Sequence, residues 1–108
     1  MCCRYGDDVQ VSVGNAVKNS AVPRAKFFIT TKVPCCPAGF TKWCTWYESE
    51  YKMLDAFTNA EIDARLLGVE IVDLLLLHWP CDKLEDTIAA YRRLEDFKLA
   101  GKARASTL

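Results

Sequence analysis

The sequence predicts an α/β fold built around a parallel β-sheet. Two segments, 27–33 and 69–77, are typical of buried strands because they are rich in apolar, β-branched and aromatic residues. Helical patterns lie before and after each of them, and such alternation favours βαβ units with short connections. Two full strands and the start of a third leave apolar surface without neighbours to cover it. We therefore expect these 108 residues to be an internal piece of a larger domain.

The first expected helix covers residues 9–18. Asp7 and Asp8 stand before it, where a carboxylate caps the first turn and complements the helix dipole. We expect the helix to end near Ser20, because Pro23 follows. Its apolar residues fall on one face, and they are Val9, Val13, Ala16 and Val17.

The first expected strand, 27–33, is closed by Pro34. Residues 34–47 follow it and contain two prolines, a glycine, three cysteines and two tryptophans without any periodicity. This composition predicts a loop.

The second expected helix covers residues 51–67. Apolar residues recur at helical intervals along it, while Glu61, Asp63 and Arg65 are expected on the polar side. Gly68 is a typical C-terminal cap, and the buried strand 69–77 follows.

The third expected helix covers residues 84–98 and shows the most regular pattern in the chain. Gly101 lies just past its end, and residues 102–105 resemble the opening of another strand. The apolar residues of this helix stand three or four positions apart, and they are Leu84, Ile88, Tyr91, Leu94 and Phe97.

Composition excludes several classes of function. The formal net charge is zero and no basic stripe is present, so we expect neither nucleic acid nor an anionic membrane as a partner. The longest uncharged apolar run, 74–77, is far too short for a membrane span. The N-terminal residues lack an apolar targeting core, which makes the cytoplasm the expected compartment. The sequence leaves the oligomeric state open.

The chain has six cysteines. Without a signal peptide, and with long helical patterns, free thiols are the better expectation than a disulfide framework. A zinc site is weakly supported, because the cysteines come in adjacent pairs and only one histidine is present.

Polar residues stand at the ends of successive elements. His78 ends the second strand, Lys32 lies at the end of the first, and Tyr5 precedes the first helix. Taken singly, the histidine and the lysine are more often ordinary surface residues. Because the carboxyl ends of neighbouring parallel strands meet at one mouth, we expect the three side chains to converge.

At this point the sequence resembles the aldo-keto reductases. The resemblance covers nearly the whole chain apart from 34–47, and it depends on several motifs in a fixed order. They are YG, VPR, FFITTKV, LGV, VDLLLLHWP and GKARA, which begin at Tyr5, Val22, Phe27, Leu67, Val72 and Gly101. The family fold is an eight-stranded TIM barrel of about 250 residues. The resemblance implies a partial (β/α)8 barrel here, from the end of strand 2 to the start of strand 5, with 34–47 as a loop insertion in an incomplete domain 1–108.

The resemblance also implies NADPH-dependent reduction of an aldehyde or ketone to an alcohol. Tyr5 would donate the proton, and Lys32 would lower its pKa from the usual value near ~10. His78 would orient and polarise the carbonyl oxygen, and Trp79 would form an apolar wall beside the small-molecule substrate. The carbonyl compound, and the choice between NADPH and NADH, stay open at this stage.

The chain departs from the family pattern in several places. The family's catalytic aspartate, five positions before the tyrosine, would precede Met1. Pro34 stands where the family often has a pocket tryptophan, for which Trp43 or Trp46 either substitutes or only packs. The Ser-Asn pair for the nicotinamide would follow strand 5, where the chain reads ASTL, and the later basic cluster for the adenosine phosphate is missing. We therefore expect the isolated chain to be inactive.

Two alternatives remain beside this interpretation. The first is a noncatalytic barrel remnant that binds another chain through its open sheet edges. The second, less favoured by the cysteine spacing, is a metal or redox module centred on Cys35, Cys36 and Cys44.

Overall fold

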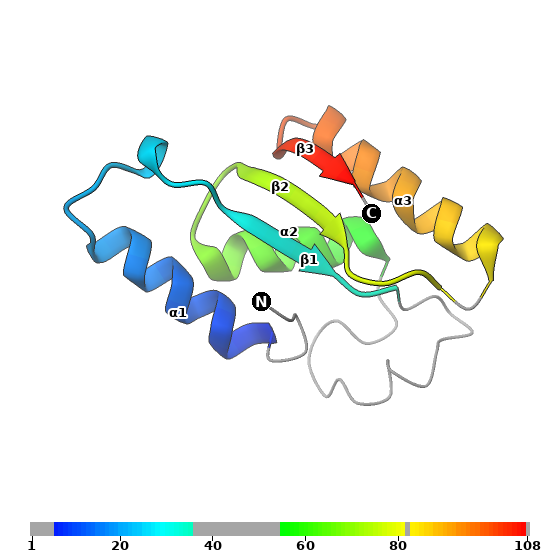
Figure 1. The fold of residues 1–108 in the computed structure, drawn as a ribbon, viewed down its shortest axis with the longest axis horizontal. Helices are drawn as coiled ribbons and strands as arrows, with labels where there is room; N and C mark the ends of the chain where they lie inside the picture. Colours follow the sequence, from blue (N-terminus) through cyan, green and yellow to red (C-terminus); the bar gives the residue numbers. More distant parts are fainter. Residues whose placement is uncertain (1–5, 36–54, 82, 108) are drawn as a thin grey trace.

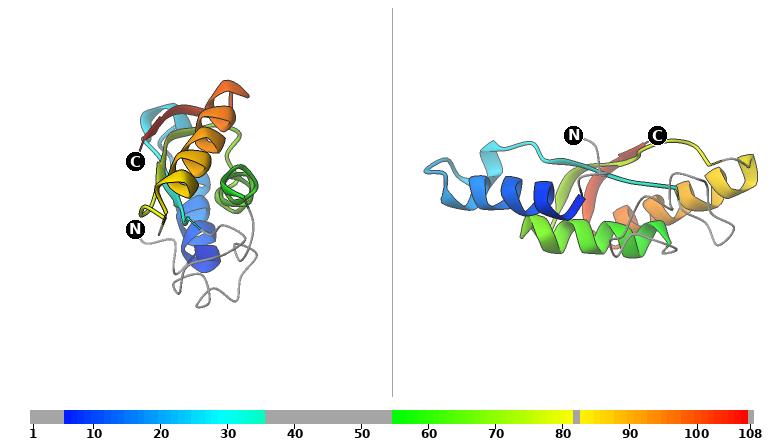
Figure 2. Two further views of the ribbon diagram at one scale, coloured as in Figure 1. Left: turned by 90° about the vertical axis from the view of Figure 1, so that its right-hand side faces the viewer. Right: turned by 90° about the horizontal axis from the view of Figure 1, so that it is seen from below.

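The computed structural model describes residues 6–35, 55–81 and 83–107, which form a three-stranded sheet with helices on one face (Figures 1 and 2). The alternation of strands and helices confirms the predicted α/β class. None of the helices in these ranges combines the length and the apolar character needed to cross a membrane. The elements in chain order are α1 (Gly6–Asn19), the 3-10 helix η2 (Arg24–Lys26), β1 (Thr30–Val33), α2 (Ala56–Leu67), β2 (Val72–Leu77), α3 (Leu84–Leu99) and β3 (Ala103–Thr107).

The sheet has the strand order β1-β2-β3, and both pairs are parallel. Lys32 pairs with Leu76, which in turn pairs with Thr107, so these three residues form one row across the sheet. The carboxyl ends of all three strands therefore lie at the same edge. This arrangement confirms the expected parallel sheet and brings Lys32 and His78 to one edge of the sheet.

Both apolar strands are shorter at their amino ends than the patterns predict. Residues 27–29 precede β1, because the chain has just left η2 and the N–H of Phe27 still donates to the carbonyl of Arg24. Val69 precedes β2, because its N–H donates to the carbonyl of Ala64 and completes the end of α2. An apolar run indicates that residues are buried, but it does not show that they pair with a neighbouring strand. The flanking residues 27–29 and 69 are apolar although they lie outside the strands.

The helices agree with the sequence patterns in type; α3 begins at Leu84 as predicted, whereas α1 and α2 differ at their starts. Helix α1 begins at Gly6, so Asp7 and Asp8 fall within its first turn, and their side chains lie outside the described part of the chain. Helix α2 begins at Ala56, after Asp55 accepts a hydrogen bond from the N–H of Phe57. Residues 51–54 are not among those that the structure describes.

Two glycines end helices as expected. Gly68 caps α2 in the left-handed conformation, with φ of 69°, and Gly101 adopts φ of 79° after α3. Both values lie in the region that glycine enters without the steric cost of a Cβ.

A third glycine allows two helices to approach closely. A Cβ on Gly14 of α1 would lie 2.8 Å from the carbonyl carbon of Leu67, at the end of α2. The core beneath the sheet is completed by large buried side chains from strands and helices, and they are Val33, Leu67, Leu75, Leu94 and Phe97.

The amino end of the sheet is held by a buried carboxylate. Asp73 accepts hydrogen bonds from the N–H of Ile29, at 2.8 Å, and from the guanidinium of Arg24, at 2.9 Å. Arg104 of β3 approaches the other carboxylate oxygen at 3.1 Å. The Ile29 N–H and the two guanidinium groups together hold the pKa of Asp73 below its ordinary value of 3.8. The register of β1, β2 and β3 is thus fixed at the end opposite to the predicted site.

Candidate active site

The carboxyl edge of the sheet carries two of the predicted site residues. Lys32 is the third residue of β1, and His78 directly follows β2. The N–H of His78 donates to the carbonyl of Val33 at 2.8 Å, so the strand ladder continues one residue past β2. Lys32 and His78 are therefore held on adjacent strands, with Lys32 opposite Leu76 and His78 two residues further along.

Lys32 and His78 also share a face of the sheet. Thr31 and Val33 are buried against the helices, which turns the intervening Lys32 to the opposite face. Lys32 pairs with Leu76, and because strand residues alternate, His78 lies on the face of Leu76. The face away from the helices thus presents an amine and an imidazole at adjacent strand ends.

The electrostatics of this pair favour a neutral histidine. Partial burial, and then the positive charge of Lys32, lower the pKa of His78 below its ordinary value of 6.5. At neutral pH the imidazole is therefore uncharged, with one N–H to donate and one nitrogen to accept. A neutral imidazole in this place can hold a carbonyl oxygen by a hydrogen bond.

Trp79 lies directly beside the imidazole. The ring centroids of His78 and Trp79 are 4.3 Å apart, with an interplanar angle of 36°. The indole is half-buried and packs against the apolar core. It therefore gives the candidate site a rigid apolar side next to a hydrogen-bonding group.

Tyr5 lies outside the described residues, as do Trp43 and Trp46, so their place in the site stays a prediction. The helix after Tyr5 is, however, tied to the strand of Lys32. The side-chain amide of Gln10 in α1 donates to the hydroxyl of Thr31 at 2.9 Å.

A buried carboxylate lies against Thr31, the residue before Lys32, and the prediction that it would be on the polar side of its helix is wrong. Asp63 was expected on the polar side of its helix, but it is 0 % exposed. The Thr31 hydroxyl donates to its carboxylate at 2.8 Å. Helix α2 packs against β1, α1 and α3, so more of its circumference is covered than an amphipathic pattern predicts. Gln10, Thr31 and Asp63 thus form a polar link through the core that no short motif signals.

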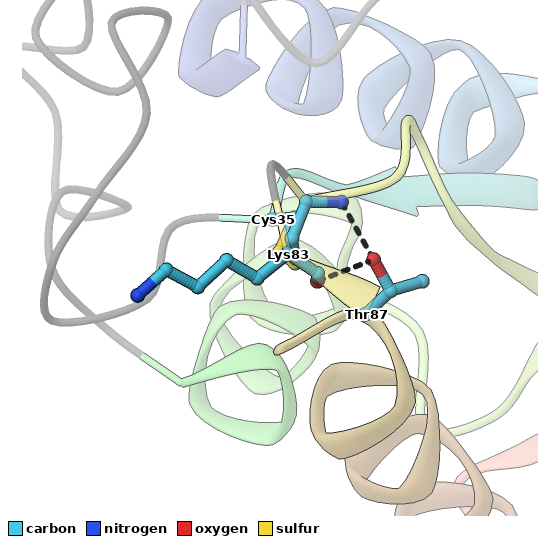
Figure 3. Close-up of a disulfide and its surroundings, with 4 residues drawn as sticks. Cys35, Lys83 and Thr87 are labelled. Atoms are coloured by element: carbon cyan, nitrogen blue, oxygen red, sulfur yellow. Dashed lines mark hydrogen bonds between the residues drawn. A yellow bond between two sulfur atoms is a disulfide. The ribbon is translucent and has the colours of Figure 1, made fainter. Parts of the chain in front are cut away.

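Cys35 and Cys81 are joined by a disulfide, and the expectation of free thiols is wrong for this pair (Figure 3). Their Cα atoms are 5.3 Å apart, within the usual range for a bridge. The register explains why the two cysteines lie close together. Val33 pairs with Leu77, and the segments that follow these residues leave the sheet at the same edge. Cys36 and Cys44 lie outside the described ranges, with Cys2 and Cys3. Within those ranges, no group of three or more His, Cys, Asp or Glu side chains could hold a metal ion.

Comparison with known proteins gives a consistent result. The model of the Aldo/keto reductase family matches residues 5–108. The chain is 35% identical to morphine 6-dehydrogenase of Pseudomonas putida over 101 residues, which cover 94% of this chain and 29% of that protein. It is 38% identical to glycerol 2-dehydrogenase (NADP(+)) of Saccharomyces cerevisiae over 68 residues, which cover 63% of this chain and 17% of that protein.

The fold is likewise similar to solved structures. An aldo-keto reductase enzyme from a Medee basin deep-sea metagenome library superimposes with a TM-score of 0.68 at 25% identity. The superposition covers 92% of this chain and 31% of that one. The chain thus spans less than a third of the length of these three proteins.

Proposed function

The chain belongs to the aldo/keto reductase family, and from that premise we propose that it carries the carbonyl-reducing part of an NADPH-dependent oxidoreductase. Its fold is part of a (β/α)8 barrel, from the end of strand 2 to the start of strand 5 of the complete domain. The observation that carries the proposal is the placement of Lys32 and His78 on one face at the carboxyl edge of the sheet. That edge is where TIM-barrel enzymes have their active sites.

In the proposed reaction an aldehyde or ketone becomes an alcohol. NADPH, when bound, supplies the hydride to the carbonyl carbon. Tyr5 donates a proton to the oxygen, on which negative charge develops. The Lys32 ammonium favours the phenolate of Tyr5 and so lowers the pKa of a phenol, which is near ~10 without such a neighbour.

His78 has a different role in the proposal. As a neutral imidazole it donates a hydrogen bond to the carbonyl oxygen and orients the substrate without adding a second proton source. Trp79 excludes water on the side of His78 and gives an apolar surface to the small carbonyl substrate.

The described residues fit the carbonyl side of this site better than the cofactor side. Lys32, His78 and Trp79 together offer a cation, a hydrogen-bond donor and an apolar wall. At the same edge Ser106 and Thr107 of β3 offer hydroxyl groups, and the described residues there include no cluster of basic side chains for the cofactor phosphates. We therefore assign no cofactor-binding residue in this chain. The NADP(+) in the name of the yeast relative supports the choice of NADPH.

The chain matches only part of the length of its relatives, and this affects which activity the isolated chain is expected to have. We propose that residues 1–108 are an incomplete aldo-keto reductase domain, that 34–47 is a loop insertion, and that the isolated chain does not turn over. The support is that the matched region is 29% of morphine 6-dehydrogenase. An active site of this type needs its groups held together in one geometry, and most of a barrel's active-site loops would lie outside so short a piece.

A chimera tests the proposal. Residues 5–108 replace the matching segment of morphine 6-dehydrogenase, and NADPH oxidation is followed at 340 nm with a panel of small aldehydes and ketones. We expect turnover in the chimera, none in Tyr5→Phe, and a shifted or flattened pH profile in Lys32→Met. His78→Gln keeps a hydrogen-bond donor and should retain more activity than His78→Leu.

Two results would contradict the proposal. Undiminished turnover in Tyr5→Phe would remove the acid from the mechanism. A folded chimera that binds NADPH but reduces no carbonyl compound would favour a noncatalytic remnant that acts by binding another chain.

A further inference from the structure

The two cysteines of the disulfide follow the candidate site residues at equal spacing. Cys35 stands three residues after Lys32, and Cys81 stands three residues after His78. The bridge therefore joins the two segments that leave the carboxyl edge from β1 and β2, just beyond the hydrogen bond from the N–H of His78 to the carbonyl of Val33. A change in this bond acts first on the segments that carry the site.

We propose that Cys35 and Cys81 form a reversible thiol–disulfide switch for low-molecular-weight thiols such as glutathione, and that its state sets the position of His78 relative to Lys32. The proposal goes beyond carbonyl reduction, since it concerns how the site is held and needs no turnover by this chain.

The two sulfur atoms belong to unequally accessible residues. Cys35 is 2 % exposed, whereas Cys81 is half-buried. Reduction therefore begins at Cys81, where a glutathione thiolate attacks the sulfur, forms a mixed disulfide and releases Cys35 as a thiolate that takes up a proton. A second glutathione thiolate attacks the mixed disulfide, which releases Cys81 and oxidised glutathione. Two electrons pass from two glutathione molecules to the protein, and oxidation reverses both steps.

The surroundings of Cys81 favour a return to the disulfide. The backbone N–H of Cys81 donates to the Thr87 hydroxyl at 2.9 Å, and that hydroxyl donates to the carbonyl of Lys83 at 3.2 Å, as the dashed lines in Figure 3 show. Thr87 is buried in the first turns of α3, so this anchor is firm. It does not depend on the sulfur, and it keeps the Cys81 thiol near Cys35 in the reduced state.

The segment from His78 to Cys81 is consequently held at both ends by backbone hydrogen bonds, at Val33 and at Thr87. The disulfide adds a covalent link from the Cys81 end of this segment to Cys35, which follows β1. Its loss frees the segment to shift sideways without unpairing the strands. A shift of this kind would expose the half-buried imidazole, since that ring lies in the released segment.

The test uses a variant of the full chain in which Cys2, Cys3, Cys36 and Cys44 are serine, so that only the proposed pair can react. The variant is equilibrated in glutathione buffers of different ratio, treated with an alkylating agent and weighed by mass spectrometry. We expect molecules with both thiols alkylated or neither, and few with one. A pair that is alkylated independently across all ratios would overturn the switch.

The effect on the site is read from the only histidine of the chain. Because His78 is unique, its imidazole proton signals in NMR are unambiguous in both redox states. We expect its pKa to rise toward 6.5 on reduction, as water reaches the ring. The same variant with both Cys35→Ser and Cys81→Ser is the matched control, and its His78 signals should not respond to glutathione. An identical His78 titration in the oxidised and reduced pair would refute the coupling to the site.

Neither readout needs NADPH or turnover, so an inactive chimera would count against the proposed function and leave the switch standing. If the four-serine variant fails to fold, peptide mapping of the unmodified chain shows directly whether Cys35 is cross-linked to Cys81. A cross-link between other cysteines would overturn the proposal.

Discussion

Replacing Gly14 with alanine tests the close approach of helix α1 to the end of helix α2. A Cβ at this position would lie 2.8 Å from the carbonyl carbon of Leu67 and closer still to its oxygen, whereas ordinary contacts begin at 3.4 Å. The atoms it meets are backbone, so no side chain can rotate away, and α1 must withdraw from the end of α2. Overpacking of this kind costs about 1–3 kcal/mol, and clashes with backbone belong at the upper end.

Helix propensity acts in the opposite direction, because alanine in place of a helical glycine stabilises by about 1 kcal/mol. The net expectation for Gly14→Ala is a loss of about 2 kcal/mol in the free energy of unfolding. Urea unfolding followed by far-UV circular dichroism measures it, with Asn15→Ala as the control. Asn15 is exposed beside it, and alanine there should stabilise slightly. A gain of about 1 kcal/mol in Gly14→Ala would show that propensity alone acts and that the helices do not touch as described.

Three further predictions concern the links that hold the sheet. The Cys35–Cys81 bridge closes a loop of 46 residues, and its reduction should lower the free energy of unfolding by about 4 kcal/mol according to the loop-entropy relation. Urea unfolding with and without reductant measures this change. An unchanged unfolding midpoint would mean that the bridge is absent in solution. Thr31→Val should lower the free energy of unfolding by about 2 kcal/mol, because it removes the hydroxyl that donates to the buried Asp63 carboxylate. Thr30→Val, at an exposed position of the same strand, should change the free energy of unfolding little. Equal losses in the two variants would argue against the link from Thr31 to Asp63. Asp73→Asn should destabilise at neutral pH and make no difference below the acid transition. The folded pKa of Asp73 is below 3.8, so its contribution is present above 3.8 and is lost as the pH falls through the folded value. A constant difference from pH 7 to pH 2 would exclude this assignment.

The sequence was informative where a residue's role depends on its own neighbours along the chain. His78 after an apolar run, Gly68 after a periodic one and Lys32 before Pro34 all carry local signals, and the structure places each at an element end. The strand ends that define the candidate site could therefore be predicted. Strand starts could not, because Phe27 and Val69 are apolar but belong to a turn and a helix end.

Links between distant residues were invisible in the sequence. Asp63 looks like a surface charge until α1 and α3 cover both flanks of α2, and Cys35 looks like a free thiol until the register brings Cys81 beside it. The contact of Asp73 with Arg24 joins residues 49 positions apart. Such pairs depend on strand register, which no pattern within one strand specifies.

The two ends of the β1–β2 pair are held by different chemistry, and this difference predicts where reduction acts. At the amino end the Asp73 carboxylate accepts from the N–H of Ile29, and the N–H of Asp73 donates to the Ile29 carbonyl. At the carboxyl end the disulfide lies beyond the bond from His78 to Val33. Only the second end contains a group that a thiol can change, so reduction should loosen that end alone.

Hydrogen exchange in the native state separates the two ends, because each has an amide with a named acceptor. After reduction the N–H of His78 should exchange faster, while the N–H of Cys81, which keeps its bond to Thr87, and those of Ile29 and Asp73 keep their protection. The Cys35→Ser variant, which lacks the bridge from the start, should show the reduced pattern in either buffer. Equal acceleration at both ends would mean that the bridge supports the sheet as a whole and has no local hold on the site. Acceleration confined to His78 would place the redox-sensitive part of the fold at the edge where a carbonyl group would be reduced.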